Sequence, residues 1–479
     1  MEGHSQEGMT TRRLVQSRCA AHALLLFAVA AISKVAAQQL PIATGATTVV
    51  ITPERGYFTE PAIALDPRNP LRVLAAYQDN AHIAYSSDGG RNWAVQSVEP
   101  PQYRVSGDVS LAYDGKGNAY VCYMAFNRLG RFNYWAKNSS RNGLYVRRSL
   151  DGGATWEQND IPIVQQPESP TVPWEDKPYI VADNNSSSPR FGNLYVGWTR
   201  WTLADSQILF SRSTDAGKSW SEPVEIDKHR GLLRDDNGAL EGFAGTVGRD
   251  GTLFVVWADN GNIVLTTSRD GGRTFSEPRN VIQTAPIMFQ LQDLSRGNGF
   301  PQIGIGPSGK SSTARLYVSW SDYRNGDVDV FCTTSVDGGT TWSEAVRVND
   351  DELHDGADQF FQWLAVDPVD GSANVLFYDR RSDPQNRSQT VTLARSVDGG
   401  RTFRNYAWSR DAFTSGDTFL GDYTGIGARG GHVYGIWTEK PPVAPEPAST
   451  VQPNRRSPEY LRSHGTVIVV GTANFKTPP

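Results

Sequence analysis

One eight-residue turn recurs six times along the chain and strongly limits the folds available to it. The copies share Ser at the first position, Asp at the third, Gly at the fifth and Trp or Phe at the eighth, and they begin at Ser86, Ser149, Ser213, Ser268, Ser335 and Ser396. The intervals between these serines are 63, 64, 55, 67 and 61 residues. Such a near-constant spacing indicates stacked supersecondary units. We expect the turn to be structural, because Asp accepts its own loop's N–H groups and Gly tolerates positive φ.

A second pattern lies between these turns: an apolar strand, a turn rich in Asp, Gly and Pro, and a strand that ends in an aromatic residue. Residues 111–123 (LAYDGKGNAYVCY) and 245–257 (GTVGRDGTLFVVW) are examples. Their alternating apolar residues and their Val, Tyr and Trp content are typical of β-strands. This strand pair occurs seven times. The sequence therefore predicts an all-β, seven-bladed propeller of four-stranded antiparallel blades, with a six-bladed propeller as the alternative.

The two ends of the chain predict an export signal and a closed ring. Residues 1–37 combine Arg12, Arg13 and Arg18, the apolar run 20–32 and small residues before Gln38, which is typical of a cleaved signal peptide; an uncleaved anchor is the alternative. Residues 38–479 then form one propeller domain, which strands 47–52 and 465–471 close by completing the seventh sheet. We expect a secreted or periplasmic protein without a membrane span in the mature chain.

The charge and the cysteines narrow the partners further. The chain has 46 Lys+Arg against 51 Asp+Glu, so no global basic field favours nucleic acid or anionic lipid. Cys122 and Cys332 remain after the signal is removed and lie in different repeats, so we expect buried free thiols rather than a disulfide. A monomer is expected.

The pattern S-x-D-x-G-x-x-W, repeated at sixty-odd residues, resembles the Asp-box (BNR) repeats of the sialidase, or neuraminidase, superfamily. The resemblance covers nearly all of the mature chain and is greatest to bacterial exported sialidase-like proteins. Sialidases of this superfamily hold the sugar carboxylate with three arginines, use a Tyr nucleophile activated by a Glu, and protonate the leaving oxygen with an Asp. The turn is called the Asp box below.

Topology places a site on the face opposite the Asp boxes, where residues enter each first strand and leave each second strand. The resemblance implies Asp79 as the acid, Tyr423 as the nucleophile and Glu241 as its activating residue. The rim supplies further charged side chains, and the proposed substrate-binding residues are Arg200, Arg324, Arg380, Arg381, Asp176 and Asp422. The superfamily's first arginine, in an Arg-Ile-Pro motif, is absent, since Thr59, Glu60 and Pro61 occupy that place.

These residues predict a secreted sialidase-like glycoside hydrolase that acts on terminal acidic sugars of glycans. The alternative is a non-catalytic propeller that binds a glycan or a protein through the same rim. Zinc spacing, a phosphate-binding Gly loop and a G-x-S-x-G element are absent from the sequence, so no cofactor is expected. The acidic stretch 349–358 offers Asp350, Asp351 and Asp355 as possible calcium ligands, although its spacing is not that of an EF-hand and a solvated loop is favoured.

Overall fold

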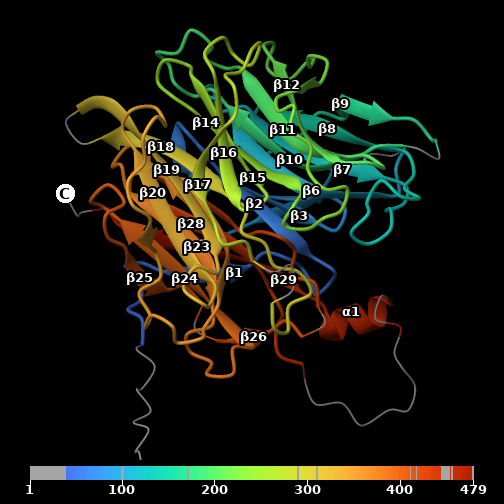
Figure 1. The fold of residues 1–479 in the computed structure, drawn as a ribbon. Coiled ribbons are helices and arrows are strands. Elements are labelled where there is room, and N and C mark those ends of the chain that lie inside the picture. The colour runs from blue at the N-terminus through green and yellow to red at the C-terminus, as the bar shows by residue number, and fades with distance from the viewer. Residues whose placement is uncertain are drawn as a thin grey trace, which may run out of the picture. The chain divides into compact units, whose positions relative to one another are not determined.

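In the computed structural model, seven antiparallel sheets contain nearly all of the regular structure (Figure 1). The structure describes residues 39–98, 102–169, 172–287, 291–308, 311–409, 411–416, 418–443, 454 and 457–476. Within these residues the one helix is α1 (Pro458–His464). The predicted seven-bladed, four-stranded architecture is confirmed, and the six-bladed alternative is wrong.

Each of the first six sheets is built from consecutive strands. Blade one contains β2 (Thr59–Asp66), β3 (Asn69–Gln78), β4 (His82–Ser86) and β5 (Ala94–Ser97); blade two contains β6 (Val105–Tyr113), β7 (Ala119–Phe126), β8 (Asn142–Ser149) and β9 (Ile161–Gln166). Blade three contains β10 (Trp174–Ala182), β11 (Leu194–Trp201), β12 (Ser206–Ser213) and β13 (Val224–Glu225); blade four contains β14 (Leu240–Val247), β15 (Leu253–Asp259), β16 (Asn262–Ser268) and β17 (Arg279–Gln283). Blade five contains β18 (Gln302–Ser308), β19 (Ser311–Asp322), β20 (Asp329–Ser335) and β21 (Val346–Arg347); blade six contains β22 (Gln359–Val366), β23 (Ala373–Asp379), β24 (Ser388–Ser396) and β25 (Arg404–Ala407), with β26 (Phe413–Thr414) added to β24.

The seventh sheet joins the two ends of the described chain. It contains β27 (Gly425–Arg429), β28 (His432–Glu439) and β29 (Val467–Asn474), and β1 (Thr47–Val50) pairs antiparallel with β29. Each first strand contacts the first strand of the next blade, and β27 contacts β2. The ring is therefore closed, which removes the exposed edges that an open stack would present.

A fully buried aromatic residue recurs within the last four residues of every second strand. Side chains of this set have 0% exposure: Tyr77, Tyr123, Trp198, Trp257, Trp320, Phe377 and Trp437. They fill the space between neighbouring sheets, where aromatic burial contributes strongly to packing. This repeated position explains why each strand pair in the sequence ends in an aromatic residue.

The Asp boxes connect the third and fourth strands of blades one to six. In the last box, Ser396 Oγ donates to Asp398 Oδ1 (2.8 Å), Gly400 N donates to Ser396 Oγ (2.9 Å) and Thr402 Oγ1 donates to Asp398 Oδ2 (2.7 Å). Gly400 has φ +82°, where a side chain would be strained. Because the third strands run parallel to the first strands, all six boxes lie on one face of the ring.

Cys122 and Cys332 are free and buried, as expected. Within the described ranges, no helix is long and apolar enough to cross a membrane. The expected signal, residues 1–37, lies outside the described residues.

Candidate functional site

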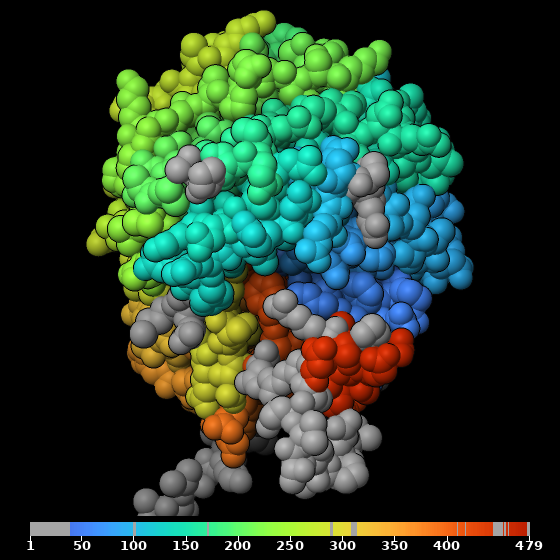
Figure 2. All heavy atoms as spheres, turned by 90° about the vertical axis from the view of Figure 1, so that its right-hand side faces the viewer, coloured from blue at the N-terminus to red at the C-terminus, as the bar shows by residue number. Residues whose placement is uncertain are grey.

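A pocket of about 180 Å³ opens at the centre of the ring, on the face opposite the Asp boxes. Figure 2 looks onto this face, and it shows a hollow bordered by blue, cyan, yellow and orange-red parts of the chain. Acidic side chains line the pocket: Glu60, Asp79, Asp108, Asp176, Glu241 and Asp422. Its cations are Lys177 and Arg296, and aromatic residues include Trp135, Trp174 and Phe419.

Four first strands, β2, β6, β10 and β14, each contain a β-bulge near their start, and these bulges direct Glu60, Asp108, Asp176, Lys177 and Glu241 toward the pocket. The strand pairing shifts between Thr59 and Ala62, between Gly107 and Ser110, between Asp176 and Tyr179, and between Glu241 and Ala244. Within these bulges Glu60, Asp108 and Lys177 have φ of 51°, 44° and 50°, a conformation that non-glycine residues rarely adopt. Bulges re-aim side chains and are frequent beside active sites. The same local feature thus delivers one or two charged groups from each of blades one to four.

Arg296 reaches the pocket from the connection between β17 and β18. Its Nη2 lies 2.8 Å from Asp235 Oδ2 and also pairs with Asp422 Oδ2, and its side chain is only 11% exposed. Trp135 Nε1 donates to Asp235 Oδ2 at 3.1 Å. The guanidinium lies 5.7 Å from the centre of the Trp135 ring and 5.5 Å from that of Phe419. Arg296 therefore pairs with two carboxylates and also lies against the aromatic rings of Trp135 and Phe419.

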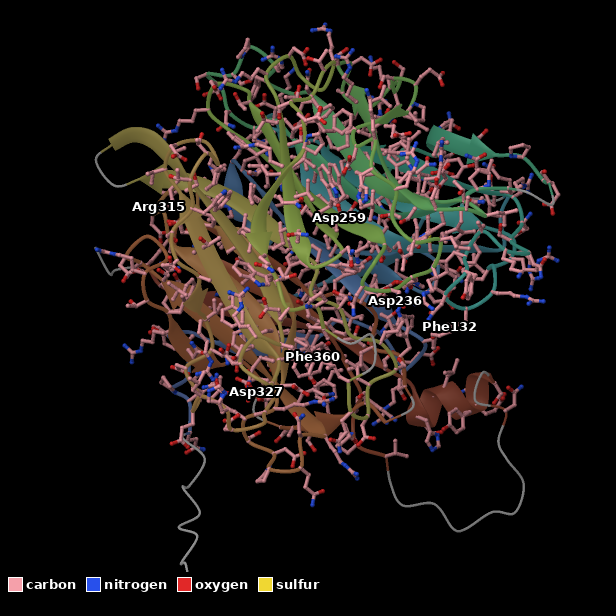
Figure 3. All side chains as sticks on the ribbon, in the orientation of Figure 1. Phe132, Asp236, Asp259, Arg315, Asp327 and Phe360 are labelled. Carbon is pink, nitrogen blue, oxygen red and sulfur yellow. The ribbon has the colours of Figure 1, made fainter. Side chains whose placement is uncertain are left out.

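The loop that carries Trp135 meets the loop that carries Asp235. Asp235 N donates to Asn133 O at 3.3 Å, and the neighbouring residues Phe132 and Asp236 lie close together in Figure 3. Phe132 is 61% exposed. These two loops, from blade two and from the connection between blades three and four, build one side of the pocket entrance.

Burial and mutual repulsion raise the pKa of three pocket carboxyls. Burial has the largest effect on Glu60, Asp176 and Glu241, and each pKa lies well above the ordinary value. Asp108 raises the pKa of both Glu60 and Asp176, to which it is also hydrogen-bonded, whereas Asp235 raises that of Glu241. Carboxyl groups this close favour the neutral form of some members. The pocket therefore favours the protonated, proton-donating form of some of its carboxyls.

An aromatic layer lies deeper in the channel, below the carboxyls. The ring centres of Tyr179 and Trp363 are 6.0 Å apart, and those of Trp363 and Tyr423 are 5.5 Å apart. Lys177 Nζ lies 4.0 Å from the centre of the Tyr423 ring and 4.5 Å from that of Phe300. Burial, followed by Asp108 and Glu60, raises the pKa of Tyr423 well above its ordinary value. The Tyr423 hydroxyl is therefore neutral, which is opposite to the activation that a nucleophile needs.

The structure brings most of the predicted acids together. Asp79, Glu241, Asp176 and Asp422 all line the pocket, and Tyr423 lies in the aromatic layer next to them. Their convergence follows from the ring topology, which places the ends of the second strands and the starts of the first strands on one face.

The four predicted substrate-binding arginines do not line this pocket. Each one instead has partners near a second-strand end: Arg200 pairs with Glu175 at 2.6 Å, Arg324 pairs with Asp322, and Arg381 pairs with Asp379 at 2.7 Å. Arg380 is fully buried, lies 4.9 Å from the centre of the Phe360 ring and donates to Gln292 O at 2.8 Å. Arg200, Arg324 and Arg381 are already paired with carboxylates, which leaves them poorly placed to hold a sugar carboxylate. Arg380 differs, because its Nε and Nη2 are buried without a hydrogen-bond partner among the described residues, but it lies outside the pocket lining.

Sequence reasoning missed Arg296, which lines the pocket, and Asp235, which pairs with it. Asp235 belongs to an acidic stretch, residues 234–242, which also contains Glu241. Arg296 occupies no repeated position, because it lies in an irregular connection between two blades. Only its contacts with Asp235 and Asp422 identify it.

The possible calcium ligands already have protein partners. Asp351 Oδ1 lies 2.9 Å from Arg347 Nη2, and Asp350 pairs with Arg381. Burial raises the pKa of Asp351 to about 6, although Arg381 opposes the shift. Within the part of the chain that the structure describes, potential metal ligands gather elsewhere: Asp227, His229 and Asp259 offer atoms within 4.8 Å of one another.

Comparison with known proteins supports a carbohydrate-active class. No family model matches the chain. A xyloglucanase from Paenibacillus sp is 27% identical over 308 residues, covering 59% of this chain and 26% of that protein. A sialidase from Bacteroides fragilis (strain YCH46) is 25% identical over 223 residues, covering 42% of this chain and 37% of that protein. The chain thus matches well under half the length of either relative.

The solved structure of the phage phi92 endosialidase shares the fold, with a TM-score of 0.50, 10% sequence identity, and coverage of 91% of this chain and 70% of that one. Together with the repeats, these similarities define the class: the chain is a sialidase-like β-propeller, as the sequence predicted.

Proposed function

We propose that the chain is a glycoside hydrolase that cleaves a glycan in the central pocket by carboxyl-based acid–base chemistry. The observation that carries the proposal is the buried carboxyl cluster, in which raised pKa values and an arginine-paired carboxylate occur side by side. Most glycoside hydrolases need two such groups, one protonated and one ionised. The similarity to a xyloglucanase and a sialidase supports this class of reaction.

Glu241 and Asp422 suit the two roles. Burial and Asp235 raise the pKa of the Glu241 carboxyl, which favours its protonated form, and it would donate this proton to the leaving oxygen as the glycosidic C–O bond breaks. Asp422 is held by Arg296 through Oδ2, while its buried Oδ1 has no hydrogen-bond partner in the described residues. That oxygen would take the proton from the attacking water.

The charge of the pocket favours a neutral sugar. Six carboxyl groups line it, against two cations, and Arg296 is already paired with Asp235 and Asp422. An incoming carboxylate would be repelled by the ionised members of this set. Trp135, Trp174 and Phe419 supply flat apolar surfaces for the C–H faces of a sugar ring.

The test is hydrolysis of a soluble xyloglucan and of 4-nitrophenyl glycosides of neutral sugars. We expect activity in the wild-type chain and a loss of about 10²–10⁴-fold in kcat for Glu241→Gln, the usual contribution of a general acid. The matched control is Glu277→Gln, a change at an exposed glutamate on the other face. An inactive wild type with folded circular dichroism would reject the hydrolase, and binding without turnover would support the non-catalytic glycan-binding alternative.

The second candidate is release of a terminal acidic sugar, as the superfamily resemblance implies. It is favoured by Arg296 and Lys177, the two cations in the pocket, and by the sialidase relative. In this version Tyr423 is the nucleophile, Glu241 activates it and Asp79 is the acid. A 4-nitrophenyl sialoside separates the candidates: its cleavage, together with inactivity of Tyr423→Phe and Asp79→Asn, would establish the second and reject the first.

We propose also that residues 1–37 direct export and are removed, which makes the propeller secreted or periplasmic. The support is the basic, apolar and small-residue order of that segment. Expression in a bacterial host, followed by fractionation and N-terminal sequencing, tests it. A mature N-terminus near Gln38 in the exported fraction is expected, whereas an intact, cytoplasmic chain would contradict it.

A further inference from the structure

The central channel has a second opening on the Asp-box face, where a cavity of about 640 Å³ lies among the far ends of the first strands. Strand β14 runs from Glu241 in the acidic pocket to Val247 in this cavity, a span of roughly 20 Å at the usual rise per residue. The aromatic layer of Tyr179, Trp363 and Tyr423 lies between the two. The cavity is therefore a separate space.

The lining of this cavity has the opposite charge to the acidic pocket. Its charged side chains are Arg249 and Arg429, and no Asp or Glu occurs among the described residues that line it. Its other polar residues are neutral hydrogen-bonding groups: Asn184, Asn185, Ser186, Ser187 and Thr246. Apolar surface comes from residues such as Leu65 and Ile305.

The loop that follows β10 holds these polar groups in place. Asn185 Nδ2 donates to Val247 O (3.0 Å) and Gly248 O (3.1 Å) in blade four, and Ser187 Oγ donates to Arg249 O (3.0 Å). Asn184 Nδ2 donates to Tyr113 O (2.8 Å) in blade two. Because each amide N–H₂ group is engaged, the side-chain oxygens of both asparagines remain as acceptors. The lining is thus organised before any ligand arrives.

We propose that this cavity binds an anionic saccharide, one that carries a carboxylate or sulfate group. The guanidinium groups of Arg249 and Arg429 would hold the anionic group, since guanidinium pairs well with planar and tetrahedral oxyanions. The asparagine oxygens would accept from sugar hydroxyls, and Leu65 and Ile305 would contact the C–H faces. A volume of about 640 Å³ lies within the range of ligand pockets and exceeds the need of a single small ion. The site is independent of the proposed hydrolase activity.

The test compares three disaccharides of the same backbone by ligand-observed NMR titration of the full chain: cellobiose, cellobiuronic acid and cellobiose 6-sulfate. We expect the two acidic disaccharides to bind more tightly than cellobiose, with an affinity that falls as NaCl is raised. The variants Arg249→Gln and Arg429→Gln should each weaken acidic-disaccharide binding about 10-fold, the size of a lost charge-assisted hydrogen bond. The two acids distinguish a carboxylate from a sulfate preference.

Two control variants locate the binding. Arg91→Gln changes an exposed arginine in the first Asp box, on the same face but outside the cavity, and should leave the affinity unchanged. Glu241→Gln in the acidic pocket should also leave it unchanged. Equal affinity for cellobiose, failure of the acidic disaccharides to bind, equal effects of Arg91→Gln, or loss of binding only in Glu241→Gln would each overturn the proposal.

Discussion

The two faces of the propeller shift the pKa of their carboxyl groups in opposite directions. In the Asp boxes, hydrogen bonds from Asn92 lower the pKa of Asp88 to about 2, and those from Thr341 lower that of Asp337. In the central pocket, burial and neighbouring carboxyls raise the pKa of Glu60, Asp176 and Glu241. In the boxes, N–H and O–H donors surround each carboxylate. In the pocket, several carboxyl groups lie close together and are buried from water.

Carboxyl groups on the two faces have different roles. A carboxylate satisfied by its own loop has no free acceptor for a substrate, so it holds a turn. A buried carboxyl that is neutral near pH 7 destabilises the fold when it ionises, and such a group is suited to proton transfer. Recurrence along the chain therefore marks the structural carboxylates, and irregular convergence marks the candidate catalytic ones.

Removal of Arg296 should have the largest effect on the pocket. Arg296→Gln leaves Asp235 and Asp422 buried without their cation, and we expect a loss of about 3–5 kcal/mol in the free energy of unfolding. Urea denaturation measures it. Arg234→Gln, which removes a half-exposed pair with Asp236, should cost at most about 1 kcal/mol. Equal losses would mean that Arg296 does not neutralise the cluster.

The pH dependence of stability should have two limbs of different origin. The raised pKa values of Glu60, Asp176 and Glu241 mean that the folded state binds more protons, so their stabilisation is present at low pH and is lost as pH rises through the folded values. The lowered pKa values of Asp88 and Asp337 mean the reverse, a loss as pH falls from about 4 toward 2.

For the buried pocket carboxyls, each additional proton that the folded state binds changes the free energy of unfolding by about 1.4 kcal/mol per pH unit. Denaturation over a pH series measures both limbs. Combining Glu60→Gln, Asp176→Asn and Glu241→Gln should flatten the limb in which stability falls as pH rises above about 4, and should leave the limb below it unchanged. A fall in stability with rising pH that survives in this triple variant would contradict the assignment.

Loss of one Asp-box carboxylate should have a moderate effect. Asp398→Ala removes the acceptor for Ser396, Thr402 and the N–H of Arg401, and we expect a loss of about 1–2 kcal/mol, comparable to a lost helix cap. Thermal unfolding measures it. Glycosidase activity at a temperature well below unfolding should remain at the wild-type value, and a large drop there would contradict a purely structural box.

Replacement of one neutral pocket carboxyl should have the smallest effect on stability. Glu60→Gln retains an acceptor for Gln78 and removes a group whose ionised form is disfavoured, so we expect a change within about 1 kcal/mol at pH 7. Chemical denaturation alongside Asp398→Ala provides the comparison. A loss of several kcal/mol for Glu60→Gln would mean that Glu60 is ionised and paired in the folded state.

The sequence predicted the ring of blades more accurately than it predicted the charged residues of the pocket. The Ser and Asp of each box, and the aromatic residue in each second strand, repeat in register, so the number of strand pairs predicted seven blades. The same topology correctly located Glu241 and Asp422 at one face. The arginines were harder to place, because an Arg that follows a strand can turn toward the channel or pair with a nearby acid, as Arg381 does with Asp379.

The sequence by itself determined the module, its number and the face on which its Asp boxes lie, since these depend on local hydrogen bonds and on strand order. Only the tertiary structure decided which charges share the pocket. Arg296 meets Asp235 and Asp422 across connections that no repeat describes, and the pKa of Glu241 depends on burial by parts of the chain distant in sequence. Electrostatic effects are set by distance and desolvation in space, and a linear order of residues specifies neither.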